Sequence, residues 1–134
     1  MEPITGARVS VVAAVIRRDG RVLIGQRRKG TRHGLKWEFP GGKVEAGEDP
    51  RRAIERELRE ELEIVAEAGE EITRFGFRYP HRPPIELIFY AVENFRGEPK
   101  CLVFEQIVWE EPERLPDYDF LEADVEFVKD LARM

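Results

Sequence analysis

The strongest constraint on the fold is a hairpin signal near the start of the chain. Residues 9–16 are apolar and rich in β-branched side chains, and residues 22–24 resume this pattern after the pair Asp19-Gly20. A two-residue turn between antiparallel strands favours Asp-Gly, because both turn positions need a positive φ. The chain is therefore expected to open with two antiparallel strands.

A loop, a helix and further strands are predicted after this hairpin. Residues 38–47 contain too much Gly and Pro for a regular element, so they are expected to form a shaped loop. Asp49 as N-cap and Pro50 in the first turn begin a helix that is predicted to reach about Leu62. Strands are expected at 72–79, 85–92 and 102–109, a turn at 96–99, and an amphipathic helix at 123–132. This order predicts an α/β fold with a mixed, partly antiparallel sheet covered by helices.

Length and composition are those of one globular domain. The 134 residues, 42% of them hydrophobic, are enough to bury a core, and a single domain over residues 1–134 is expected. The N-terminal residues lack the layout of a signal peptide, and the longest apolar run, 11–16, is far too short to span a bilayer. Cys101 is the one cysteine, which fits a reducing compartment. A cytoplasmic protein without membrane association is therefore predicted.

The charge distribution is uneven along the chain. The net charge is -5, yet residues 17–36 carry eight Lys and Arg side chains against Asp19 alone. The overall negative charge argues against a nucleic-acid polymer as partner. A small polyanion, held between cationic side chains and a metal ion, is compatible with this balance.

The predicted helix carries closely spaced carboxylates in residues 56–64, RELREELEI. At about 100° per residue, Glu57, Glu60 and Glu61 project from one arc of the helix. Like charges at this spacing destabilise a helix by a few tenths of a kcal/mol per pair, and a divalent cation would reverse that effect. Such hard oxygen ligands suit Mg²⁺ or Mn²⁺ better than zinc. A solvated charged face remains the commoner explanation for this stretch alone.

The wider pattern resembles a known family. Gly42, Glu48 and residues 56–62, with the lead-in LKWEFPGGKVEAGE, resemble the Nudix box of the MutT-like Nudix hydrolases. The likeness is clearest over residues 9–64 and still visible in 108–124. It implies an α/β/α sandwich and metal-dependent hydrolysis of (d)NTPs, such as 8-oxo-dGTP or modified dCTP, to the monophosphate and pyrophosphate. The alternatives are another nucleoside diphosphate-linked substrate, or a catalytically silent nucleotide-binding regulator.

The resemblance also implies roles for individual residues. The catalytic and metal-binding carboxylates would be Glu57, Glu60 and Glu61, with the Gly41 carbonyl as a further ligand and Mg²⁺ or Mn²⁺ as the cofactor. Glu48 and Arg56 would form a structural pair between loop and helix. Which glutamate is the general base stays open, as does the choice between monomer and homodimer.

Four further residues match substrate contacts of this branch. Arg27 and Arg28 resemble its phosphate contacts. Phe39 either lines a base pocket or belongs to the core. Asp124 resembles the residue that reads the base, although its position also suits the N-terminus of a helix.

Two positions depart from the family pattern. Members often carry another metal-binding Glu on a later strand, where this chain has Val103, and Glu105 lies two residues nearer to Trp109. Glu105 either replaces that ligand through a shifted register or is a charge at a strand edge. Glu63 stands where the box has glycine, so either it adopts the left-handed conformation, at a cost of about 1 kcal/mol or more, or the helix ends differently.

Overall fold

The computed structural model describes residues 9–134. The prediction that the N-terminal residues are not a signal peptide, and residues 1–8 of the predicted domain, lie outside the described residues. Strands β1 (Val9–Arg18) and β2 (Arg21–Gln26) form the predicted antiparallel hairpin. Asp19 and Gly20 in its turn have φ values of 53° and 77°. Both turn residues thus take the positive φ that the Asp-Gly pair predicts.

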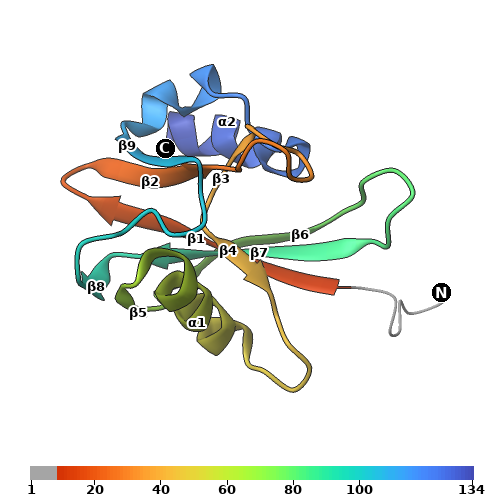
Figure 1. Cartoon of the computed structure of the whole chain (residues 1–134), viewed down its shortest axis with the longest axis horizontal. Helices are drawn as coiled ribbons and strands as arrows, with labels where there is room; N and C mark the ends of the chain where they lie inside the picture. The colour runs from red at the N-terminus through yellow and green to blue at the C-terminus, as the bar shows by residue number, and fades with distance from the viewer. Residues whose placement is uncertain (1–8) are drawn as a thin grey trace.

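A mixed sheet forms the middle layer of the molecule (Figure 1). Its strand order is β3-β2-β1-β7-β6, with β4 also paired to β1 and β9 to β2. β1 and β7 run parallel, and the other strand pairs are antiparallel. The bounds of the remaining strands in this sheet are β3 (Trp37–Glu38), β4 (Gly41–Lys43), β6 (Glu71–Phe77), β7 (Ile85–Val92) and β9 (Gln106–Glu110). The mixed, partly antiparallel sheet is as predicted.

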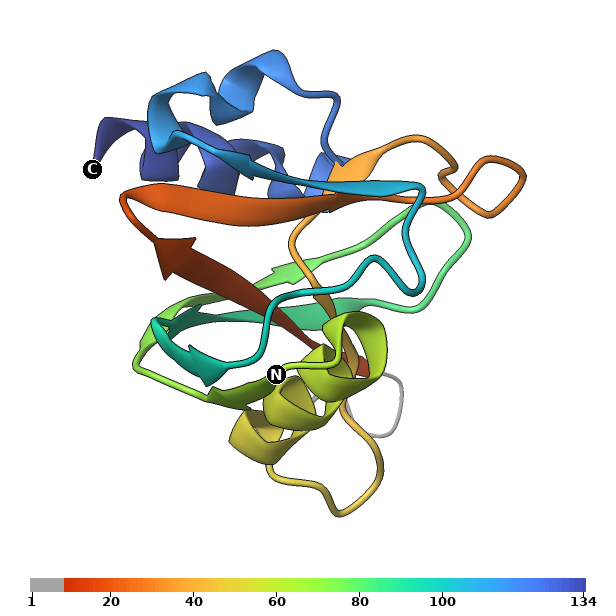
Figure 2. The same cartoon turned by 60° about the vertical axis from the view of Figure 1, so that its left-hand side comes forward.

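Helices cover both faces of the sheet (Figure 2). Helix α1 (Pro50–Leu62) packs on one face, and α2 (Val125–Arg133) packs on the other with two 3-10 turns, η1 (Pro112–Asp117) and η2 (Glu122–Asp124). Successive side chains of β1 point to opposite faces: Val12 and Ala14 join the α1-side core, whereas Ala13 and Val15 join the α2-side core. The α/β/α sandwich is therefore confirmed.

Helix α1 begins as predicted and ends at the residue that departs from the expected glycine. The Asp49 side chain accepts a hydrogen bond from the Arg51 backbone N–H at 2.7 Å. After Leu62, Glu63 adopts φ 58° and ψ 39°, and its backbone N–H donates to the Arg59 carbonyl. Glu63 therefore takes the left-handed conformation itself, the first of the two expected alternatives.

Several strand predictions need correction. Residues 41–43 form β4 rather than loop, because Gly41 has no Cβ to clash with the Val12 carbonyl across the pair. β5 (Val65–Glu67) and β8 (Asn94–Arg96) form an unpredicted two-stranded sheet. Ile64, just before β5, is fully buried, whereas Val65 is exposed.

The expected strand at 102–109 is regular only in its second half, where β9 begins at Gln106. Its first half is irregular because the Arg28 guanidinium holds the carbonyls of Leu102 and Phe104 at 3.1 and 3.3 Å. β6 and β7 match the strands predicted at 72–79 and 85–92, and the closing helix forms as α2. Within residues 9–134, no helix is long and apolar enough to cross a bilayer.

Candidate active site

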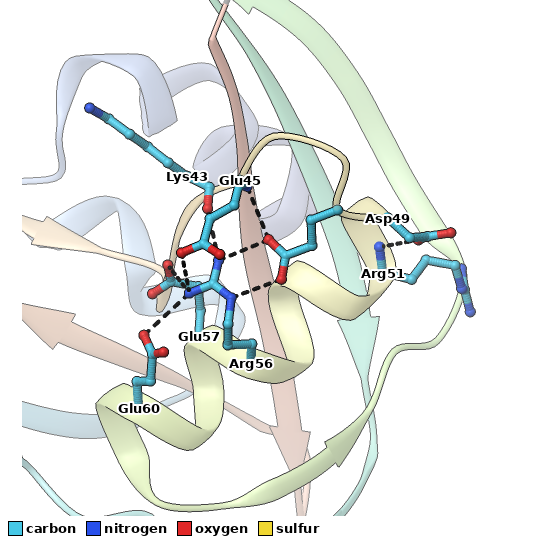
Figure 3. A network of polar contacts seen from close by, with 8 residues as sticks. Lys43, Glu45, Asp49, Arg51, Arg56, Glu57 and Glu60 are labelled. Carbon is cyan, nitrogen blue, oxygen red and sulfur yellow. Dashed lines mark hydrogen bonds and ion pairs between the residues drawn. The ribbon is translucent and has the colours of Figure 1, made fainter.

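Arg56 is the centre of a polar network between α1 and the loop that precedes it (Figure 3). Its Nε and Nη2 atoms donate to the two Glu48 carboxylate oxygens at 2.8 and 3.0 Å, and Nη2 also donates to the Lys43 carbonyl. The hydrogen bond from Arg56 lowers the pKa of Glu48 to about 2. The loop of residues 44–49 is thus tied to the helix, in the manner expected of the Glu48–Arg56 pair.

The same guanidinium also faces the predicted metal-binding carboxylates. Nη1 of Arg56 lies 3.2 Å from a Glu57 oxygen and 3.3 Å from a Glu60 oxygen. Glu57 is largely buried, with 15% of its side chain exposed, whereas Glu60 is 58% exposed. One arginine therefore offsets part of the repulsion between glutamates that share a helix face.

Glu61 lies deeper, beside the glycine pair. It accepts a hydrogen bond from the Gly41 backbone N–H at 3.2 Å, and the Glu57 carboxylate packs against Gly42, where any Cβ would collide with it. Burial raises the pKa of Glu61 strongly, and the nearby charges of Glu57 and Glu38 raise it further. Burial also raises the pKa of Glu57, with Arg56 opposing the shift. The missing side chain of Gly42 thus leaves room for the Glu57 carboxylate in its present position, and the Glu57 and Glu61 carboxyl groups favour sharing a proton or a cation.

The α1 carboxylates provide suitable donors for a divalent metal. Within residues 9–134, no three His, Cys, Asp or Glu side chains already converge as a ready-made metal site. The reason is visible in the contacts: Glu57 and Glu60 turn to Arg56, whereas Glu61 turns to Gly41. Glu57 and Glu61, which burial makes difficult to ionise, nevertheless fit a hard cation, which would stabilise their charged forms.

Arg27 and Arg28 both bind groups of this chain. Arg27 contacts the Glu38 carboxylate at 3.2 and 3.4 Å and donates to the Arg32 carbonyl. Arg28 holds the irregular segment 102–105 through two backbone carbonyls. Both arginines follow the end of β2, where the sequence placed them, and any phosphate would compete with these partners.

Phe39 and Asp124 are adjacent but buried. Phe39 is 3% exposed and stacks on Phe120, with ring centroids 5.3 Å apart, so its side chain belongs to the α2-side core. Asp124 is 5% exposed and makes no capping hydrogen bond at the start of α2. Burial raises its pKa well above the ordinary value, the charge of Glu38 adds to this, and the Phe39 backbone N–H opposes it. Asp124 is therefore a buried carboxyl group rather than a helix cap.

The later-strand position lies just before the start of β9. Glu105 precedes β9, and its carboxylate accepts a hydrogen bond from the Lys29 backbone N–H at 3.2 Å. Val103 is 45% exposed. In this arrangement the Glu105 carboxylate contacts the backbone just after β2, and its role as a metal ligand stays a prediction.

Glu38 was not singled out from the sequence. It lies between Trp37 and Phe39, which are both core residues, and its charge raises the pKa of both Glu61 and Asp124. The sequence did carry a signal for Glu38, namely a charged residue between two aromatic residues.

Near α2 there is a cavity of about 420 Å³. Its lining includes His33, Lys36, Tyr79 and Phe120 but none of the predicted site residues.

Comparison with known proteins gives a family match. The model of the NUDIX domain matches residues 6–131. The chain is 39% identical over 117 residues to the CTP pyrophosphohydrolase of Escherichia coli (strain K12), covering 87% of this chain and 86% of that protein. It is 38% identical over 121 residues to the 8-oxo-dGTP diphosphatase of Haemophilus influenzae, covering 90% and 88%.

Solved structures share the fold as well. The solution structure of the E. coli ORF135 protein matches with a TM-score of 0.82 and 38% identity, over 91% of this chain and 86% of that chain. The crystal structure of a MutT NUDIX hydrolase from Burkholderia pseudomallei matches with a TM-score of 0.81 and 28% identity, over 92% and 97%. These similarities cover nearly the whole described sandwich.

Proposed function

The chain belongs to the NUDIX domain family, and from this premise we propose that it hydrolyses nucleoside triphosphates to the monophosphate and pyrophosphate with the help of a divalent metal ion. One observation carries the proposal: Glu57 and Glu61 form a desolvated carboxylate pair against Gly41 and Gly42, with Glu60 beside them on the same helix face. The relatives' names cover a ribonucleotide and an oxidised deoxyribonucleotide, so both sugar types belong to the proposed substrate range.

The residues would divide the chemistry between binding and activation of water. Glu57, Glu60 and Glu61 would hold Mg²⁺, or alternatively Mn²⁺, with the Gly41 carbonyl as a further ligand. Such an ion, when bound, supplies the positive charge that neutralises a polyphosphate. One of the glutamates positions or deprotonates the attacking water. The Glu48–Arg56 pair fixes the loop so that the glycines stay next to these carboxylates.

The substrate contacts would come from residues outside helix α1. Arg27 and Arg28 are proposed to release part of their present contacts and bind phosphate oxygens. Phe39 and Asp124 are proposed to meet the base, which requires their segments to open because both residues are buried. An ionised Asp124 only accepts hydrogen bonds, so it suits a cytosine amino group or guanine N1 and N2.

A substrate panel tests this proposal. Pyrophosphate release would be followed for 8-oxo-dGTP, dGTP, dCTP, 5-methyl-dCTP and CTP with Mg²⁺, and release of nucleotide products for a nucleotide sugar and a dinucleoside polyphosphate. We expect turnover of at least one triphosphate at a rate well above that of the other two classes. Binding without turnover of any triphosphate would contradict the proposal and favour a nucleotide-binding regulator.

A further inference from the structure

Strand β6 is the last strand in the order of the seven-stranded sheet (Figure 1). It pairs with β7 on one side, and within residues 9–134 no strand pairs with its other side. The pairing with β7 is irregular between Glu71 and Thr73 and then regular as far as Phe77. The outward backbone N–H and C=O groups of residues 73–77 are therefore placed to pair with an added strand.

A mainly apolar groove of about 440 Å³ lies between β6 and α2. Its lining includes Phe75 and Phe77, which are half-buried and belong to the α2 side of the sheet. It also includes Met134, whose exposed fraction is 77%. None of the residues assigned to catalysis, metal or substrate lines this groove. An apolar groove beside an unpaired strand edge is an arrangement that binds extended peptides.

The helix side of the groove carries a carboxylate row, which consists of Glu122, Glu126 and Asp130. The three residues are spaced by four, so Glu126 and Asp130 lie one turn apart on α2, and Glu122 precedes them. Lys129 and Arg133 pair with two of these carboxylates, but both pairs are exposed and therefore weak. Among the described residues that line the groove, none is basic.

These features together suit a basic partner in an extended conformation. Alternate side chains of an added strand would lie beside Phe75 and Phe77 and reach toward the carboxylate row. Lys and Arg suit that place, because the aliphatic stem packs on the rings while the charge meets a carboxylate. A second copy of this chain suits it less, since two acidic rows and two net charges of -5 would repel.

We propose that β6 and this groove form a docking surface for a basic, extended segment of another protein. The segment adds a strand to the sheet at residues 73–77 and directs alternate Lys or Arg side chains to the carboxylate row. The surface shares no lining residue with the proposed active site, so the inference does not depend on the proposed hydrolysis.

A defined peptide tests the docking surface. A fluorescein-labelled peptide of alternating Lys and Thr would be titrated with the wild-type protein, and its Kd measured by fluorescence anisotropy. Two control peptides have the same composition: in one, all Lys residues form a single block, and in the other, every backbone N–H is methylated. The alternating peptide is expected to bind about tenfold or more tightly than either control, because it alone offers both strand hydrogen bonds and correctly spaced charges.

Protein variants locate the binding on the carboxylate row. Glu126→Lys and Asp130→Lys should each raise the Kd of the alternating peptide by about fivefold or more. Both residues are exposed, so folding and triphosphate turnover should stay unchanged. Glu113→Lys is the matched control, because it makes the same charge change at an exposed residue of η1 and should alter the Kd by less than about twofold. The peptide should also slow amide hydrogen exchange in residues 73–77.

Several outcomes would overturn the inference. Absence of binding by the alternating peptide would refute it, and equal affinity for the methylated peptide would reduce the surface to a patch of charge. Unchanged Kd in both groove variants would place the binding elsewhere. Self-association that slows exchange in residues 73–77 would assign the edge to a second copy, and binding only after removal of residues 1–8 would assign it to the chain's own N-terminal residues.

Discussion

In its proposed role, Glu61 would favour function at the expense of stability. It lies beside Glu57 and Gly41, and burial, followed by the charge of Glu57, raises its pKa. A carboxyl group whose folded-state pKa is raised above the ordinary 4.5 destabilises the fold at pH values above 4.5, where the unfolded chain has released the proton. The effect is absent below that pH and grows as the pH rises.

Glu61→Gln is therefore expected to abolish hydrolysis while stabilising the metal-free protein. The glutamine oxygen can still accept from Gly41, and its amide group can donate to Glu57 in place of the repulsive charge. Thermal unfolding in EDTA should show a gain of about 1 kcal/mol at pH 8 and less at pH 5. A loss of stability at pH 8, or retained turnover, would show that the role given to Glu61 is wrong.

Some residues of this site could be placed from the sequence, and others could not. Glu57, Glu60 and Glu61 lie on one short helix, so their spacing alone places them on one face. Glu38 gains its position only when β3 pairs with β2 and α2 packs nearby. Contacts between distant segments, such as that of Arg28 with Leu102, have no signature in the local pattern.

At the scale of elements, the end of α1 is a site of local strain. Glu63 has φ 58°, which costs a residue with a side chain about 1 kcal/mol or more relative to glycine. Its exposed ion pair with Lys100, at 3.4 Å, offsets little of that cost. The helix pattern predicted where α1 stops, but not which of two end geometries it uses.

Glu63→Gly should therefore raise the free energy of unfolding by up to about 1 kcal/mol and leave turnover unchanged. Glu63→Ala is the control, because alanine removes the ion pair but keeps the strained conformation, and no gain is expected. Denaturant unfolding measures both variants. Loss of activity in Glu63→Gly would place Glu63 in the site.

One glycine of β2 leaves room for the Phe104 ring in the contact between β2 and the segment 102–105. Gly25→Ala would put a Cβ 2.6 Å from the Phe104 ring, so we expect a loss of about 1–3 kcal/mol in unfolding experiments. Gly76→Ala is the matched control in β6, since its Cβ would meet only the Ile85 carbonyl at 3.7 Å. Equal effects of the two substitutions would show that Phe104 does not hold this segment against β2.

For the molecule as a whole, the order of elements predicted a mixed sheet covered by helices, and the family resemblance implied the α/β/α sandwich. Local sequence patterns predicted the Asp19-Gly20 hairpin, the capped helix α1 and the strands β6 and β7. All four elements are present in the structure. The pairing of β4 with β1 and the small β5–β8 sheet did not follow from local patterns, because short pieces of backbone are stabilised by their neighbours. The fold was thus more predictable than the contacts around the site.

The α1 carboxylates are proposed to support metal-dependent attack on a nucleoside triphosphate. The most direct measurement is product analysis by ³¹P NMR after incubation of the preferred triphosphate with protein stripped by EDTA, then with Mg²⁺ restored. We predict no turnover in EDTA, and the monophosphate with pyrophosphate in equal amounts once Mg²⁺ is present. Turnover that persists in EDTA, or the release of a diphosphate with orthophosphate, would contradict the account.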